Sequence, residues 1–169
     1  MAKKRKKQTD TAAVLFGIYG LIMIYLLFIR GRHAVEGMPY WEQVLNNYNL
    51  TPFHTMGNYW HILTNKAYYL EKWQSYDVYL RNVRHAVINL VGNVVMFVPL
   101  GFLVPCIWQK TGKFGWHLLT MGLSIVGIEL IHLFTLLGTC DVDDLLLNLV
   151  GTTMGFLLWK LCCRMYKKN

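Results

Sequence analysis

Charged residues are scarce in this sequence. Asp, Glu, Lys and Arg make up 15% of its 169 residues, whereas 54% are hydrophobic and the mean hydropathy is +0.31. A soluble domain of this length does not need such an apolar surplus, but a chain with several membrane-spanning segments does. The scarcity of charge therefore argues against a soluble globular protein and favours one built around long apolar segments.

Several recognisable kinds of site are also absent from the sequence. The four cysteines, at positions 106, 140, 162 and 163, have neither the spacing of zinc ligands nor that of a disulfide framework. We find no phosphate-binding loop and no nucleophile elbow. The net charge of +8 comes from basic residues clustered at the chain ends and at the ends of apolar runs, which is not the pattern of a nucleic-acid-binding face. We therefore predict no nucleic-acid partner and no metal site, and we leave any cofactor unassigned.

Four long apolar segments predict transmembrane helices, because each is long enough to cross the hydrocarbon of a bilayer. They cover residues 12–29, 86–108, 114–137 and 145–163. The first exceeds the apolar core of a signal peptide, and Arg30 and Arg32 follow it in place of a small-x-small cleavage site, so we expect an uncleaved helix. Pro99 is expected to kink the second helix. The predicted fold is an all-α polytopic integral membrane protein, a single domain over residues 1–169.

The distribution of basic residues predicts how these helices are oriented. Five precede the first span, two lie in the 109–113 turn and four close the chain, whereas the much longer 30–84 loop carries six. By the positive-inside rule, we expect both chain ends in the cytoplasm of a bacterial cell membrane and the 30–84 loop outside it. The loop is rich in Tyr and Trp, which favour the membrane–water interface. We expect it to lie along the outer headgroup layer, with short helices around 42–48 and 59–84 and a break at 50–53.

On this topology the polar residues of the spans gather in one leaflet. The eight side chains are Asn89, Asn93, Glu129, His132, Asp141, Asp143, Asp144 and Asn148. Glu129 lies about 12 Å below the outer end of its helix at ~1.5 Å per residue, and His132 is one turn nearer the surface. The three Asp residues stand at the mouth of the fourth helix. Charge is costly in hydrocarbon, so this outward-facing set is predicted to bind a ligand in a polar cleft, with Glu129 and His132 as candidate catalytic residues.

Members of this set also have structural interpretations. Glu129 has to be protonated, paired with His132 or His85, or open to a water-filled cleft. One of the three Asp residues can cap the fourth helix, and the asparagines can form hydrogen bonds between helices. Gly151 and Gly155 have the spacing that allows two helices to pack closely. Ligand binding and structural support therefore both remain open for individual residues.

These residues also carry a resemblance to a known family. The matching pieces are Asn89-x-x-Gly92-Asn93-x-x-x-Phe97-x-Pro99-x-Gly101, then Glu129, then Asp141-x-Asp143-Asp144 followed by Asn148-x-x-Gly151-x-x-x-Gly155, with Asn49-Leu50-Thr51-Pro52-Phe53 in the loop. In this order the chain resembles the VanZ-like membrane protein family over roughly residues 14–160. His132 stands where the family commonly has Gln, and Gly138-Thr139 where many members have Arg. The resemblance implies a bacterial plasma-membrane protein, and some VanZ-like proteins are associated with resistance to teicoplanin.

Three functions fit these features. The resemblance favours a membrane factor that changes how lipid-tailed glycopeptides meet the cell envelope. An enzyme acting on an envelope lipid or a lipid-linked cell-wall precursor is the alternative, with Glu129 and His132 as general acid or base and the three Asp residues on Mg²⁺. A transporter or proton-coupled channel fits less well, because the polar groups occupy one leaflet only. A metal site joining His132, His85 and an Asp is a further possibility.

Overall fold

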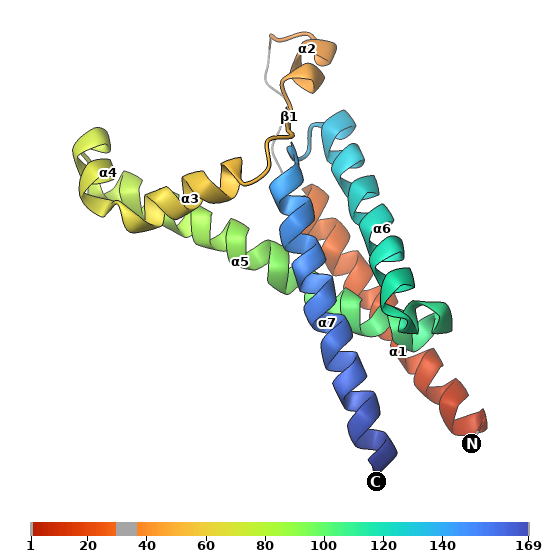
Figure 1. Ribbon diagram of the computed structural model, residues 1–169. Coiled ribbons are helices and arrows are strands. Elements are labelled where there is room, and N and C mark those ends of the chain that lie inside the picture. Colours follow the sequence, from red (N-terminus) through yellow and green to blue (C-terminus); the bar gives the residue numbers. More distant parts are fainter. Residues whose placement is uncertain (1, 30–36, 169) are drawn as a thin grey trace.

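Four long helices dominate the structure (Figure 1). The computed structural model describes residues 2–29 and 37–168. The long helices are α1 (Ala2–Ile24), α5 (Tyr76–Ile107), α6 (Phe114–Thr135) and α7 (Val142–Lys168). Stretches long and apolar enough to cross a membrane lie at Thr9–Phe28, where α1 continues into the π-helical segment η1 (Tyr25–Ile29), and at Tyr76–Ile107, Phe114–Thr135 and Val142–Tyr166. The predicted all-α membrane fold with four spanning helices is confirmed.

Helix α5 begins ten residues before the predicted second span of 86–108. Ser75 is its N-cap, and the Ser75 hydroxyl accepts a hydrogen bond from the backbone N–H of Val78 at 3.4 Å. Asp77 adds negative charge to the first turn, where it meets the helix dipole favourably. The helix then continues through Pro99 to Ile107. Hydropathy located the apolar part of α5, but the polar turns before it are helical because they have their own cap.

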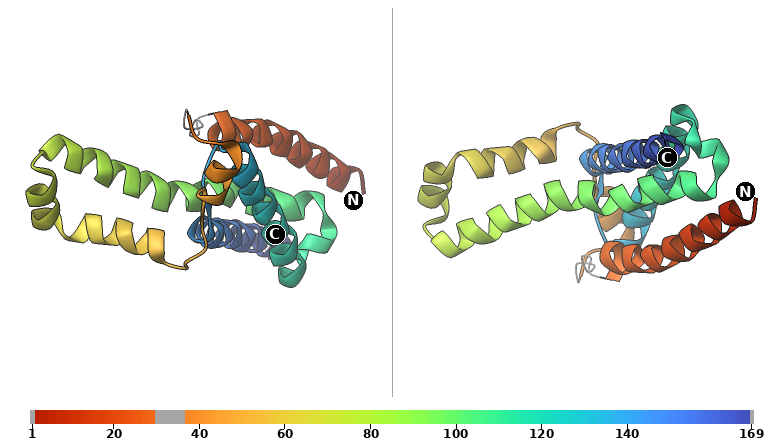
Figure 2. Two further views of the ribbon diagram at one scale, coloured as in Figure 1. Left: turned by 90° about the horizontal axis from the view of Figure 1, so that it is seen from above. Right: turned by 90° about the horizontal axis from the view of Figure 1, so that it is seen from below.

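Several short elements fill the segment between the first two spans. They are α2 (Tyr40–Leu45), β1 (Tyr48–Asn49), α3 (His54–Thr64) and α4 (Lys66–Trp73). Helices α3 and α4 pack beside the first half of α5, and together they form an arm that extends to one side of α1, α6 and α7 (Figures 1 and 2). Gln74, with φ of 49°, turns the chain from α4 into α5. The predicted loop is thus largely helical, and its start with Arg30 and Arg32 lies outside the described residues.

Glycines bring α5 and α7 into backbone contact. A Cβ on Gly151 would overlap the carbonyl oxygen of Val94, and one on Gly155 would overlap that of Val98. Gly101 of α5 has the same relation to Thr152 of α7. The predicted packing role of Gly151 and Gly155 is therefore confirmed. Next to this contact, the buried residues Met23, Phe97 and Ile125 join α1, α5 and α6 in one apolar core.

The remaining turns are short. A 3-10 turn, η2 (Gln109–Gly112), joins α5 to α6, and Gly112 lies against the Trp159 ring of α7. At the other end of α6, the two-residue strand β2 (Cys140–Asp141) leads directly into α7. Five of the eight predicted site residues lie in this turn or in the helix ends on either side of it: Glu129, His132, Asp141, Asp143 and Asp144.

Candidate functional site

A parallel pair of two-residue strands fixes the turn between α6 and α7. Strand β1 pairs with β2, so that Tyr48 lies opposite Cys140 and Asn49 opposite Asp141. Asn47 continues the pairing, because its carbonyl oxygen accepts from the N–H of Cys140 at 3.1 Å. The segment before α3 is thereby joined to the start of α7.

The end of α6 is closed by the Asn47 side chain and by a glycine. The Asn47 amide donates to the carbonyl oxygens of His132 at 3.2 Å and of Gly138 at 2.8 Å. Leu136 ends the helix in the left-handed conformation, with φ of 57°. A Cβ on Gly138 would lie 2.8 Å from the His132 ring, so a glycine is needed for the turn to fold back over that ring.

Glu129 and His132 lie side by side beneath this turn. Only 5% of Glu129 and 8% of His132 are exposed. Oε2 of Glu129 accepts from the backbone N–H of Asp141 at 3.2 Å and lies 3.8 Å from Nδ1 of His132. Nε2 of His132 is 3.2 Å from the carbonyl oxygen of Leu27, and the ring contacts Phe28 at 5.0 Å between centroids. Glu129 is thus paired with His132, as one of the expected alternatives had it. Its second partner, the backbone N–H of Asp141, was not indicated by the sequence.

Asp141 is the cap of α7, and it also joins α7 to the segment around the start of α3. Its Oδ1 accepts from the N–H of Asp143 at 2.9 Å, which is the N-cap contact at the start of a helix. Its Oδ2 accepts from the hydroxyl of Thr55 at 2.6 Å. The Asn49 amide donates to Thr55 at 3.0 Å and lies 3.4 Å from both carboxylate oxygens. The prediction that one Asp caps the fourth helix is confirmed for Asp141.

Asp143 caps a different helix from its own. It is fully buried, and its two oxygens accept from the N–H groups of Phe53 at 2.6 Å and Met56 at 2.9 Å. Phe53 is the N-cap residue of α3, has φ of 63° and cannot cap with its own side chain. Four N–H groups at the start of a helix have no partner within it, and a carboxylate there also meets the positive end of the helix dipole. Asp143 therefore holds the base of the arm against α7.

The asparagines connect α5 to its neighbours. The Asn93 amide donates to Oδ1 of Asp144 at 2.5 Å, which links α5 to α7. The Asn89 amide donates instead to the Tyr59 hydroxyl of α3 at 3.1 Å. Asn148 is 2% exposed, and its Oδ1 has no hydrogen-bond partner among the described residues.

Comparison with known proteins gives the family. A protein-family model described as VanZ/LLP1 matches residues 16–163, which include every residue of this site. The chain belongs to the VanZ/LLP1 family. Neither the curated proteins nor the solved structures contain a match to it. The resemblance drawn from the sequence motifs is confirmed.

In this VanZ/LLP1 protein, six of the eight predicted residues meet where α6, α7 and α5 approach one another. We call the four carboxylates among them, Glu129, Asp141, Asp143 and Asp144, the acidic junction. Asn89 is turned toward the arm, and Asn148 is not linked to the junction by a hydrogen bond. His85 is exposed, with its ring 6.1 Å from the Tyr59 ring. Asn47, Asn49 and Thr55 were not predicted as site residues, although Asn49 lies in the loop motif of the family resemblance.

Most carboxylate oxygens of the acidic junction accept hydrogen bonds from other groups of the protein. Among the described residues, no three His, Cys, Asp or Glu side chains are grouped so that they could hold a metal ion. Burial raises the pKa of the Cys140 thiol, and the negative charges of Glu129 and Asp141 raise it further, so Cys140 is not an activated nucleophile. The junction of this family member is built mainly as a set of hydrogen bonds to backbone groups.

The surface of the described residues carries at least two grooves, and these two are apolar. One lies between the start of α3 and α7 and is lined by Phe53, Met56, Leu146, Leu147, Leu149, Val150, Thr153 and Met154. The other lies between α1, α5 and α7. None of the eight predicted residues lines either groove. The outward-facing polar cleft remains a prediction.

Proposed function

We propose that this protein is a non-catalytic membrane factor that lowers the susceptibility of a bacterial cell to lipid-tailed glycopeptides such as teicoplanin. Membership of the VanZ/LLP1 family supports a role in the cell membrane. The basic residues at the chain ends support a cytoplasmic location for both, which would place the arm and the acidic junction at the outer leaflet. One observation carries the proposal: an open apolar groove lies beside a junction in which each of the four carboxylates accepts an internal hydrogen bond.

The contacts of the junction support a non-catalytic role. A general acid or base has to reach the substrate, directly or through one water molecule. Asp143 is fully buried with both oxygens on backbone N–H groups, and both oxygens of Asp141 accept hydrogen bonds. One oxygen of Glu129 accepts from the N–H of Asp141, and Nε2 of His132 lies 3.2 Å from the Leu27 carbonyl oxygen. These groups therefore act on the shape of the protein, and the groove beside them is apolar.

The groove between α3 and α7 is the surface that we assign to the lipid tail. Its volume is about 490 Å³, and Phe53 and Met56 form the side nearest Asp143. By the proposed orientation it opens into the outer leaflet, where the tail of an arriving lipoglycopeptide inserts. Burial of an alkyl chain against these side chains gains close contacts at each methylene group. Retention of the tail at the membrane reduces the amount of antibiotic that reaches its cell-wall target.

The test is antibiotic susceptibility in a sensitive Gram-positive host. Wild-type protein is expected to raise the inhibitory concentration of teicoplanin several-fold and to leave that of vancomycin, which has no lipid tail, unchanged. Val150→Trp fills the groove and is expected to abolish the effect. Val126→Trp is the matched control, because Val126 is exposed on α6 to a similar extent, 40% against 51%, and lines neither groove. Membrane levels of all variants are compared by immunoblot.

Two outcomes would count against this proposal. Equal teicoplanin susceptibility with and without well-inserted wild-type protein would rule out the glycopeptide role. Full resistance in Val150→Trp would be compatible with the glycopeptide role but would show that the groove between α3 and α7 is not needed for it.

An enzyme acting on an envelope lipid is the second candidate, favoured by the distance of 3.8 Å between Glu129 and His132 in a buried site. Glu129→Gln keeps the shape of the side chain and removes its acid–base chemistry. Comparison of the membrane lipids of hosts expressing wild type and Glu129→Gln distinguishes the two functions. A lipid species changed by wild type and not by the variant would favour the enzyme, and identical lipid profiles would exclude it.

A further inference from the structure

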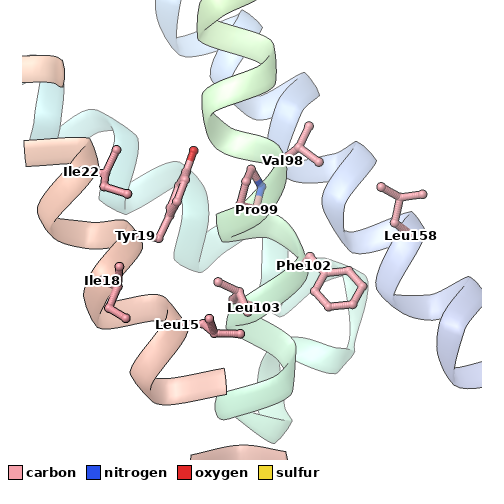
Figure 3. Close-up of a pocket in the computed structure, with 9 residues that line it drawn as sticks. All are labelled: Leu15, Ile18, Tyr19, Ile22, Val98, Pro99, Phe102, Leu103 and Leu158. Carbon is pink, nitrogen blue, oxygen red and sulfur yellow. The ribbon is translucent and has the colours of Figure 1, made fainter. Parts of the chain in front are cut away.

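The second groove lies between the middle of the first span and the second halves of α5 and α7. Leu15, Ile18, Tyr19 and Ile22 of α1 face Leu158 of α7 across Val98, Pro99, Phe102 and Leu103 of α5 (Figure 3). Its volume is about 470 Å³, which is within the range of sites for small molecules. The Tyr19 hydroxyl, the one polar side-chain group in this lining, already donates to the Met96 carbonyl oxygen at 2.7 Å. The groove therefore offers only apolar contacts to a bound molecule.

Helix α1 is less closely packed here than its neighbours are. Leu15 is 51% exposed and Ile18 is 54% exposed, although both face the groove. By contrast, Gly101 and Gly155 bring α5 and α7 into backbone contact. A hydrocarbon chain bound in the groove would fill the space between α1 and α7 and supply the contacts that no protein side chain makes there.

Basic residues surround the end of the spans nearest this groove. Residues 3–7 give α1 five basic positions in its first turns, and α7 continues beyond Leu158 to Lys160 and Arg164. The η2 turn brings Lys110 and Lys113 to the same end, because Gly112 lies against the Trp159 ring. Both chain ends lie at this end of the molecule (Figure 1). Asp10 is the only acid in the sequence segments 2–12, 108–114 and 158–168.

We propose that the groove and this basic end together bind one anionic phospholipid, with an acyl chain in the groove and the phosphate beside the basic residues. Clusters of Lys and Arg next to a transmembrane helix attract anionic headgroups. The apolar lining takes the acyl chain of any phospholipid equally well, so the charge of the helix ends selects the anionic class. The site shares no lining residue with the groove between α3 and α7, and it does not depend on the proposed function.

The first test measures lipid binding to the purified full-length protein in detergent by native mass spectrometry. Phosphatidylglycerol is expected to bind several-fold more tightly than phosphatidylcholine with the same acyl chains. Ile18→Trp fills the groove and is expected to weaken phosphatidylglycerol binding several-fold. Leu21→Trp is the matched control on the same helix, because Leu21 is 70% exposed and does not line the groove. Equal binding of the two lipids, or equal binding to the two variants, would overturn the proposal.

The charge is tested separately from the groove. Lys160→Gln combined with Arg164→Gln is expected to weaken phosphatidylglycerol binding and to leave phosphatidylcholine binding unchanged. Lys66→Gln combined with Lys72→Gln, in the arm, is the control with the same change of charge and is expected to have no effect. If the arm variant weakens binding as much as the α7 variant, the basic end is not the headgroup site.

A measurement on the unaltered protein covers the case in which a tryptophan variant fails to fold. Phosphatidylglycerol with a diazirine in its acyl chain is photolysed in vesicles that contain the wild-type protein. Adducts are expected to concentrate on the groove residues of α1 and on Leu158. Adducts spread equally over the exposed α6 positions Leu119 and Leu123 would show that no specific site exists.

Discussion

Helix α7 is held in two different ways along its length. At its start, Asp141 and Asp143 use all of their carboxylate oxygens on partners in the segment around α3 or at the start of α7 itself. In its middle, Gly151 and Gly155 let the backbone of α5 approach until no side chain separates the two helices. The first contact is made of hydrogen bonds to irregular backbone, and the second is made of close packing between regular helices.

The difference follows from what each level of the membrane requires. Irregular backbone next to a bilayer has to find hydrogen-bond partners in the protein, because hydrocarbon provides none. Between two helices in hydrocarbon there is little hydrophobic gain, since lipid tails are as apolar as the side chains, and close packing becomes the main source of stability. The acidic junction meets the first requirement and the glycines meet the second.

The largest effect is expected from a methyl group in the glycine contact. Gly155→Ala places a Cβ onto the Val98 carbonyl oxygen and is expected to destabilise the protein by about 2–3 kcal/mol, as overpacking does elsewhere. Gly127→Ala is the control, because nothing lies within 4 Å of its new Cβ. Since alanine is the better helix former, Gly127→Ala is expected to stabilise by roughly 0.5–1 kcal/mol. Reversible unfolding in mixed detergent micelles measures both changes, and the same sign for the two variants would contradict the packing contact.

A smaller and more local effect is expected at the polar contact. Asp143→Asn leaves one acceptor for two backbone N–H groups of α3 and is expected to cost about 1–2 kcal/mol, the range for loss of a helix cap. Hydrogen–deuterium exchange is expected to increase in α3 and to stay unchanged in α6. Asp77→Asn is the control, because Asp77 is exposed in the first turn of α5. Unchanged exchange in α3 would show that Asp143 does not hold the arm.

The glycine contact and the general position of the junction were predictable from the sequence. A small-xxx-small pair such as Gly151 and Gly155 allows close helix packing wherever it lies in a span. Depth in the membrane follows from the number of residues between a side chain and the end of its helix, which is why Glu129 and Asp144 were expected at one level.

The partners within the junction were not predictable. Asp141 meets Asn49 and Thr55 across 92 and 86 residues of sequence, and the path of the chain between them depends on tertiary structure. The sequence contains one indication of the unusual cap of α3: Pro52 and Phe53 precede the helix, and neither side chain can cap it. A helix that begins without a capping side chain needs an acceptor from elsewhere, but the sequence does not say that Asp143 provides it.

The hydrogen bond between Asn93 and Asp144 lies between the polar contacts at the start of α7 and the glycine contact in its middle, and it sharpens the comparison of the two. A double-mutant cycle with Asn93→Ala and Asp144→Ala is expected to give a coupling energy of about 0.6–2 kcal/mol, the range for side-chain hydrogen bonds between membrane helices. The corresponding cycle with Asn89→Ala and Tyr59→Phe, in the arm, is expected to give less, because that hydrogen bond is longer, 3.1 Å against 2.5 Å. Equal coupling in the two cycles would show that the shorter bond between α5 and α7 is no stronger than the longer bond in the arm.

The smallest expected effect reports only the electrostatics of the acidic junction. The pKa of the Cys140 thiol is raised by burial and then by Glu129 and Asp141, so less of it is thiolate at neutral pH than in a free thiol. In a chain whose other three cysteines are replaced by serine, maleimide labelling of Cys140 is expected to rise with pH in a window above that of a free thiol. Glu129→Gln removes one negative charge, lowers this pKa and shifts the window toward neutral pH. Glu42→Gln, on exposed α2, carries the same charge change and is expected to leave the labelling profile in place. A profile that does not respond to Glu129→Gln would mean that burial alone sets the reactivity of Cys140, and that the acidic junction acts on its surroundings through hydrogen bonds and not through its charge.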